Sequence, residues 1–112
     1  MLDAAQKTER IRKLNDTLRM TFQGGRVMLT SGFNALPETL KAQVIERVKA
    51  FSEFDMANDP HGEHDFINFE IEGQLFFVKL DYYDRTLHFG AEDPSDAEQT
   101  TRVMTVMLAD EY

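Results

Sequence analysis

The residues best suited to chemistry lie in one short segment that combines histidine with carboxylates. It runs from Asp59 to Asp65 and reads Asp-Pro-His-Gly-Glu-His-Asp. Imidazole and carboxylate groups are the ligands of zinc and other first-row metals. A metal-dependent enzyme would draw its ligands from Asp59, His61, His64 and Asp65. The spacing differs from the helical His-Glu-x-x-His arrangement, which places both histidines on one face of a helix. The alternative is that Asp59, Glu63 and Asp65 cap the backbone of their own loop, as Asp side chains commonly do.

A second candidate for chemistry is the pair Asp81 and His88. If Asp84 and Arg85 form a turn, the pair lies directly opposite on neighbouring strands. A carboxylate beside an imidazole is the start of a general-base arrangement. The sequence has no cysteine, and its serines fall at predicted turns or at a predicted helix cap, so no nucleophile is evident. We therefore favour an ordinary cross-strand polar pair and assign no catalytic residue.

These candidates are positioned by a predicted antiparallel meander, whose first part is a hairpin. Apolar and polar residues alternate over 65–72 and again over 74–82, which is the period of a strand with unlike faces. Glu72-Gly73 lies between the two runs and suits a tight turn, because Gly accepts a positive φ. With this turn, Phe69 pairs with Phe76, and the flanking pairs are Ile67 with Val78 and Ile71 with Gln74.

The same reasoning predicts a third strand of the meander. A turn at Asp84-Arg85 places Tyr82 opposite Leu87 and Leu80 opposite Phe89. Both turns then give one continuous apolar face, and a slip of one residue would turn an apolar set outward.

The other face of the meander is mixed. Large apolar side chains lie among polar ones there, which is unlike a plain solvated face. Cover by a helix of the same chain is the commoner arrangement. The alternative is a partner-binding patch, whose residues would be Phe66, Asn68, Glu70, Glu72, Leu75, Phe77, Asp81, Tyr83 and His88.

The remaining elements are read from periodicity and caps. Residues 4–22 predict a helix that ends at Gly24-Gly25, and residues 26–30 predict an edge strand. Pro37 opens a second helix that ends near Ser52, and residues 53–64 form a loop. Ser95 and Glu98 fit a capping box for a last helix that runs to about residue 109. The predicted fold is α+β, an antiparallel three- to four-stranded sheet with helices packed on it, in the order α-β-α-β-β-β-α.

Composition bounds the class of protein. The 112 residues predict a single domain, 1–112. Without cysteine there is no disulfide, no thiolate metal site and no thiol nucleophile. No apolar run approaches the length of a membrane span, and the start lacks the apolar core of a signal peptide. We expect a cytoplasmic protein of a bacterial or similar cell, without a cofactor and without membrane binding.

Charge is divided unevenly along the chain. The net charge is −8, with +4 over residues 1–52 and −12 over residues 53–112. An acidic surface repels nucleic acid and attracts basic proteins, so the asymmetry bears on partners rather than on fold. The alternative is that the excess acid serves solubility alone.

Four blocks of the chain resemble a family of short bacterial proteins. They read FQGGRVMLTSG (22–32), NDPHGEHDF (58–66), KLDYYD (79–84) and RVMTVMLADEY (102–112), and EHDF and DYYD are the most specific parts. The family is domain-of-unknown-function family number three-seven-six-eight. The resemblance implies no assigned activity. It does imply an association with plasmids and related mobile elements, which would suit an accessory or anti-defence factor.

Our first hypothesis is therefore a small acidic interaction protein that is not an enzyme. Its acidic C-terminal half would engage a basic protein surface by nucleic-acid mimicry, with carboxylates standing in for phosphates, and would not bind nucleic acid itself. The alternative is the metal-dependent enzyme described above. Homodimerisation through Phe66, Leu75 and Phe77 is compatible with either.

Overall fold

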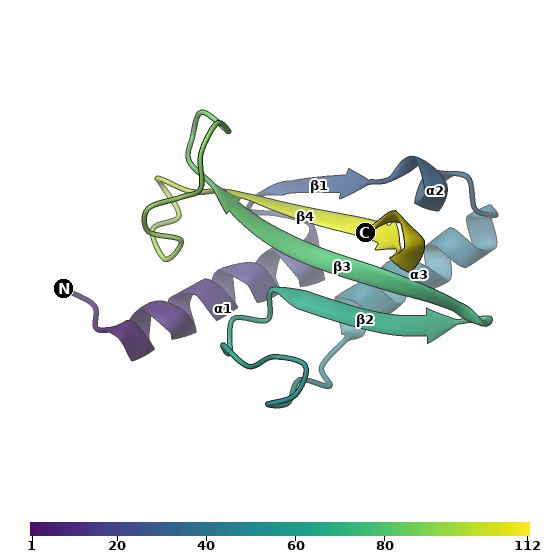
Figure 1. Cartoon of the computed structure of the whole chain (residues 1–112), viewed down its shortest axis with the longest axis horizontal. Coiled ribbons are helices and arrows are strands. Elements are labelled where there is room, and N and C mark those ends of the chain that lie inside the picture. Colours follow the sequence, from purple (N-terminus) through teal and green to yellow (C-terminus); the bar gives the residue numbers. More distant parts are fainter.

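The sheet orders the whole molecule. The computed structural model describes residues 1–112 and contains one four-stranded sheet in the order β1-β4-β3-β2 (Figure 1). The strands are β1 (Arg26–Leu29), β2 (Phe66–Ile71), β3 (Gln74–Tyr83) and β4 (Thr101–Leu108). β1 runs parallel to β4, whereas the other neighbours are antiparallel. The α+β class is confirmed, but the sheet is mixed and not antiparallel throughout.

Three α-helices and a short 3₁₀ helix complete the chain. They are α1 (Ala4–Thr21), α2 (Ser31–Asn34), α3 (Glu38–Ala50) and η1 (Ala109–Glu111). α1 begins at a capping box formed by Asp3 and Gln6, and Phe22 ends it in the left-handed conformation. Pro37 precedes α3, as expected for a residue without an N–H. No helix combines the length and apolar character that crossing a bilayer requires.

The helices all pack on one face of the sheet. Leu18 of α1, Phe33 of α2 and Val44 of α3 are buried in a single core cluster. The sheet contributes the side chains that point toward these helices, which are Ile67, Phe69, Phe76, Val78, Leu80, Met104 and Val106. Figure 1 shows α1 and α3 behind the strands in the same layer. The opposite face, which we call the open face, has no α-helix over it, and only η1 lies against one end of it.

The β2–β3 hairpin has the predicted register. Phe69 pairs with Phe76, and the flanking pairs are also as expected. Glu72 and Gly73 form the turn with φ of 52° and 78°, which is the geometry of the hairpin turn whose twist matches its strands. The rings of Phe69 and Phe76 are 5.9 Å apart, so the pair contributes to the core next to the helices.

The predicted third strand of the meander is wrong. Residues 84–90 form a loop, in which Asp84 N–H donates to the Phe89 carbonyl (2.8 Å). The Asp84 carboxylate accepts bonds from Thr86, and Leu87 has φ of 64°, which no strand adopts. Only the isolated bridge between Tyr83 and Gly90 continues the pairing. The neighbour of β3 is β4 instead, so the pairs of Tyr82 with Leu87 and of Leu80 with Phe89 do not form.

The predicted last helix is also wrong, because that part of the chain is β4. Alternation over residues 101–108 places Arg102, Met104 and Val106 toward the helices. β-Branched residues occupy much of the strand and favour extended backbone. Ser95 does not cap a helix, since its hydroxyl donates to Asp93 (2.5 Å) within a series of turns. The observed order is therefore α-β-α-α-β-β-β with a final 3₁₀ helix.

Replacing Phe76 with Ala tests the core beneath the hairpin. Phe76 is fully buried, so we expect Phe76→Ala to lower the free energy of unfolding by about 3–5 kcal/mol. The neighbouring Leu75 points to the open face and is 41% exposed, so Leu75→Ala serves as the control and should cost less than about 1 kcal/mol. Urea titration measures both. Equal losses would contradict the assignment of the two faces.

Candidate functional site

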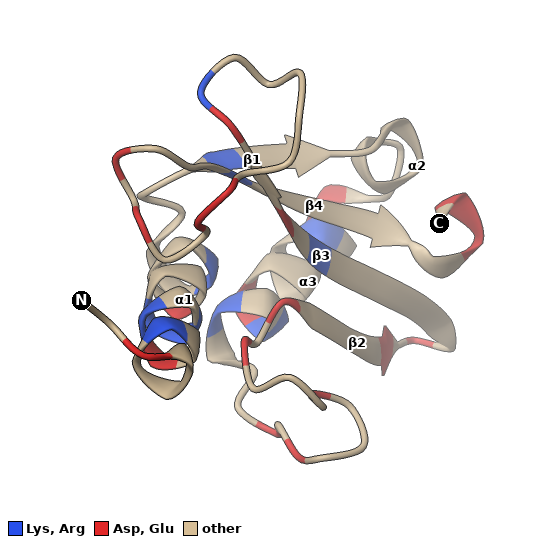
Figure 2. Cartoon of the chain, turned by 60° about the vertical axis from the view of Figure 1, so that its left-hand side comes forward, with Lys and Arg blue, Asp and Glu red and all other residues tan.

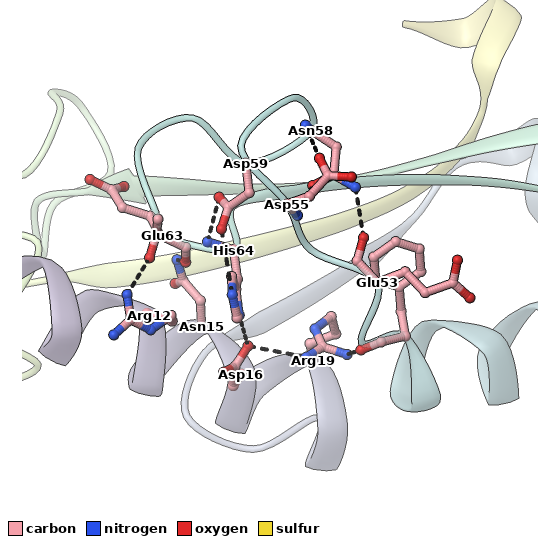
Figure 3. Close-up of polar contacts among 12 residues, drawn as sticks. Arg12, Asn15, Asp16, Arg19, Glu53, Asp55, Asn58, Asp59, Glu63 and His64 are labelled. Carbon is pink, nitrogen blue, oxygen red and sulfur yellow. Dashed lines mark hydrogen bonds and ion pairs between the residues drawn. The ribbon is translucent and has the colours of Figure 1, made fainter.

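The densest polar cluster lies between α1 and the loop that precedes β2 (Figure 3). Its centre is Asn15, which is completely buried on the sheet-facing side of α1. The Asn15 amide donates to the carbonyl of Glu63 (2.9 Å) and to the Tyr82 hydroxyl oxygen (2.8 Å). Its oxygen accepts a bond from Arg102 Nε (2.8 Å). One side chain therefore joins α1, the loop, β3 and β4.

Tyr82 and Arg102 extend this cluster into the sheet. The Tyr82 hydroxyl donates to Glu63 Oε1 (2.8 Å), and the Arg102 guanidinium lies 5.2 Å from the centre of the Tyr82 ring. Burial, together with the bond to Glu63, raises the pKa of the Tyr82 phenol, so the hydroxyl keeps its proton. Burial lowers the pKa of Arg102. The Arg102 charge is held by Asn15 and by the Pro94 carbonyl, which accepts a bond from its guanidinium.

His64 closes the loop against α1. Its Nδ1 donates to Asp16 Oδ1 (2.8 Å), and its Nε2 lies 3.4 Å from Asp59 Oδ2. The ring stacks on Phe54 with centres 3.6 Å apart. The backbone N–H of His64 donates to Asp59 Oδ1 (3.0 Å), so Asp59 does cap its own loop. Both ring nitrogens face a carboxylate, which leaves no nitrogen turned toward a substrate.

Arg19 attaches the end of α3 to the same helix. Its guanidinium donates to the carbonyl groups of Val48 (3.0 Å) and Phe51 (2.9 Å), and to Asp16 Oδ1 (3.1 Å). A helix leaves its last carbonyl groups without internal partners, and a cation there also complements the helix dipole. Arg19 is 3% exposed, so it acts as an internal cap for α3. Asp16 is shared by Arg19 and His64.

The proposed metal ligands do not come together as a set. His64 contacts Asp59, but His61 is exposed on the loop and Asp65 precedes β2. No group of three or more His, Cys, Asp or Glu side chains has the arrangement needed to hold a metal ion. Burial raises the pKa of Asp65, and the nearby charges of Glu63 and Asp59 add to the rise. The cluster accordingly joins chain segments and presents no nucleophile.

The Asp81–His88 pair is not formed either. Asp81 is opposite Val103 of β4 and makes an ion pair with Lys79 (3.2 Å). His88 lies in the exposed loop after β3, beside Phe89. The general-base arrangement that the false third strand would have created is therefore absent.

Most of the predicted partner-binding residues do share the open face. No α-helix covers it, because the segment expected to form a last helix is β4 and the three α-helices pack on the opposite side. Only η1 and the following Tyr112 fold over part of it, and the Tyr112 ring lies 6.2 Å from the Phe66 ring and 5.6 Å from the Phe77 ring. The predicted partner-binding residues that lie on or beside the open face are Phe66, Asn68, Glu70, Glu72, Leu75, Phe77, Asp81 and Tyr83. His88 is in the loop after β3 instead.

One end of the open face is hollowed and acidic. A depression of about 460 Å³ lies between the β2–β3 turn and η1, and its lining includes Glu72, Leu75 and Asp110. Glu70 and Glu72 are exposed, as is Asp110. Figure 2 shows acidic segments around the strands and in the loops before β2 and after β3, whereas the basic ones gather mainly on α1 and α3. The uneven charge along the sequence is thus also uneven in space.

Sequence reasoning missed the residues at the centre of the polar cluster. Asn15 and Arg19 are four positions apart on the buried stripe of α1, and each interrupts the apolar pattern set by Ile11 and Leu18. A polar side chain on an apolar helix stripe is the signal that was available. Arg102 on the inward face of a strand would have given the same signal, once that strand was recognised.

Comparison with protein-family models matches residues 29–111 to the family described as "Protein of unknown function (DUF3768)". The match covers the sheet from the end of β1 onward and both specific blocks, EHDF and DYYD, while α1 lies outside it. No curated protein and no solved structure matches the chain.

Replacing Asn15 with Ala tests the polar cluster. The change leaves Arg102 Nε and the Glu63 carbonyl without their partner, so we expect a loss of about 2–4 kcal/mol in the free energy of unfolding. Asn34→Ala is the matched control, because Asn34 is exposed and makes one bond of 3.3 Å. A loss at Asn15 no larger than at Asn34 would contradict the role of this cluster.

Asp65 gives a prediction about pH. A carboxyl whose pKa is raised by folding destabilises the fold when ionised, and this penalty vanishes below its ordinary value of 3.8. Asp65→Asn should therefore raise the free energy of unfolding at about pH 8, with the gain shrinking as pH falls toward 4. Asp84→Asn should do the reverse, because the bond from the Thr86 hydroxyl lowers the pKa of Asp84. Urea titrations across pH would refute this if both variants shifted in the same direction.

Proposed function

Because the chain belongs to the family described as "Protein of unknown function (DUF3768)", whose description assigns no activity, we propose a function from the geometry of its surface. The protein is a small non-enzymatic binding module that engages a basic protein surface through the open face of its sheet. The observation that carries this proposal is a sheet face without an α-helix over it, on which apolar side chains lie next to carboxylates.

The apolar part of the surface supports a protein partner. Leu75 is 41% exposed and Tyr112 is 75% exposed. The Tyr112 ring contacts the half-buried Phe66 and Phe77, and Leu75 is two residues from Phe77 on the same face of β3. Aromatic groups with partial cover are typical anchors of protein interfaces, since they bury much area at little cost in rotamer entropy. An exposed patch of this kind is more often an interaction site than an accident of folding.

The acidic part of the surface indicates the chemistry of the partner. The depression near η1 combines the Leu75 side chain with the carboxylates of Glu72 and Asp110. A lysine or arginine of the partner fits such a site, because its methylene stem packs on Leu75 while its cationic head meets the carboxylates. Net charge of −8 would further speed the approach of a basic protein at low salt and repel nucleic acid.

In this proposal the partner is a protein whose basic surface otherwise binds nucleic acid, and the carboxylates take the place of phosphates. Such an activity suits an accessory or anti-defence factor of a mobile element, as the family resemblance implies. The polar cluster around Asn15 has a supporting role, because it holds α1 and the loop before β2 on the far side of the sheet.

A positive charge introduced into the depression tests the proposal. We expect the wild-type protein to retain a basic partner from bacterial cell extract at low salt and to release it at about 0.5 M salt. Leu75→Lys should weaken that complex by at least about tenfold, because it introduces a cation where the partner's cation binds. Calorimetric titration of the identified partner measures the change.

The matched control is Gln43→Lys, which also adds one positive charge but lies at an exposed position of α3. It should weaken binding less than about threefold, through the change in net charge alone. Equal weakening by both variants, or retention that does not depend on salt, would contradict binding at the open face.

A further inference from the structure

The free edge of β2 presents unpaired backbone groups. β2 is the last strand of the sheet, with β3 as its only neighbour. Leu80 N–H donates to the Asp65 carbonyl (2.9 Å), which makes Phe66 and Lys79 a pair without mutual hydrogen bonds. It follows by alternation that Ile67, Phe69 and Ile71 bond to β3. The N–H and C=O groups of Phe66, Asn68 and Glu70 therefore point away from the sheet.

This edge lacks most of the features that protect natural sheet edges. Such edges carry a proline, a lysine or a bulge, or lie beneath another segment. β2 has neither proline nor lysine, and its register with β3 is unbroken from Phe66 to Ile71. The opposite edge, β1, is shorter and has a positive charge at Arg26. The polar side chains of β2 are those of Asn68 and Glu70, and only Glu70 carries a charge that protects this edge.

We propose that an extended segment of the partner adds to the sheet as an antiparallel strand beside β2. This inference rests on the proposed function and states how the partner engages. The added segment alternates basic and apolar residues. Its basic side chains lie on the open face, about 5 Å from Asn68 and Glu70, and its apolar side chains lie on the helix side, beside the half-buried Ile71.

Charge complementarity favours this occupant over a second copy of the chain. Two copies paired along β2 would bring their Glu70 and Glu72 side chains to one seam, with a net charge of −8 on each copy. A basic segment removes that repulsion and supplies the hydrogen-bonding partners of an edge strand. On the helix side, the Arg47 guanidinium lies 5.5 Å from the centre of the Phe69 ring. The apolar side chains of the added strand would therefore pack beside Phe69 and the Arg47 side chain.

Synthetic peptides test the inference directly on the full chain. The probe is a peptide that alternates lysine and valine. Lysines that lie beside Asn68 and Glu70 in an antiparallel pair are also the residues whose N–H groups face β2. N-methylation of the lysine amides should therefore weaken binding at least about tenfold, whereas N-methylation of the valine amides, which face solvent, should leave it within about threefold. Equal binding of the two methylated peptides would overturn the inference.

Hydrogen exchange on the complex supplies a second readout that needs no variant. The amide hydrogens of Phe66, Asn68 and Glu70 should exchange rapidly in the free protein and become protected when the unmethylated peptide binds. Unchanged exchange at those three amides, at a peptide concentration that saturates the protein, would overturn edge pairing and leave binding at the open face intact.

A variant separates this inference from the proposed function. Asn68→Pro removes one outward N–H without removing a bond to β3, and Asn68→Ala keeps that N–H. We expect the proline variant to bind the identified partner at least about tenfold more weakly than the alanine variant, with both folded by urea titration. If Leu75→Lys abolishes partner binding but the Asn68 variants bind equally, the proposed function stands and edge pairing is refuted. If none of these changes affects the partner, both are refuted.

Discussion

The bond between Arg102 and Asn15 joins the centre of the sheet to the first helix, and the arrangement of the molecule depends on it. β4 lies between β1 and β3, so its inward side chains meet the helix layer at the middle of the core. A buried guanidinium is costly unless its donors are satisfied. Asn15 and the Pro94 carbonyl satisfy two of them, which ties α1 and the loop before β4 to one place on that face.

The other polar side chains of the cluster are also bonded to groups from distant parts of the chain. Asn15 uses its amide for Glu63 and Tyr82 while its oxygen receives Arg102. Arg19 satisfies carbonyl groups at the end of α3. Apart from Arg19 Nε, which is buried without a hydrogen-bond partner, these polar groups are occupied by one another. They therefore position the helix layer. All these contacts are on one side of the sheet, and the other side has no α-helix.

The hairpin could be predicted because two local signals agree. Alternation in each run and the Glu72-Gly73 turn independently require Phe69 to face Phe76, and both signals act over neighbouring residues. β4 could not be predicted in that way. Its residues fit a helical stripe through Met104 and Leu108 as well as they fit a strand. The choice between helix and strand depends on pairing with β1, which is far away in the sequence. If β4 is not recognised as a strand, the true neighbour of β3 is missing from the prediction. Residues 87–89 were wrongly assigned to its place in the sheet.

The candidate site was predicted in part for the same physical reason. Side chains on the open face follow from the alternation of β2 and β3 alone, so their shared face is a local property. The partners of Asn15 and Arg19 are carbonyl groups and side chains from distant segments. No local pattern in the sequence specifies these partners. A polar residue on the apolar stripe of a helix indicates only that it has a hydrogen-bonding partner.

The charge of the chain is consistent with an open face and a free edge in one small protein. An uncovered sheet invites pairing with other copies through its backbone groups and its apolar side chains. Helical cover and closure of the sheet are the usual remedies, and neither is present on this face. Carboxylates at Glu70, Glu72 and Asp110 provide a different one, because they repel another copy of the chain at close range. The same carboxylates attract a surface of opposite charge, so in the proposed binding mode the groups that oppose self-association also select the partner.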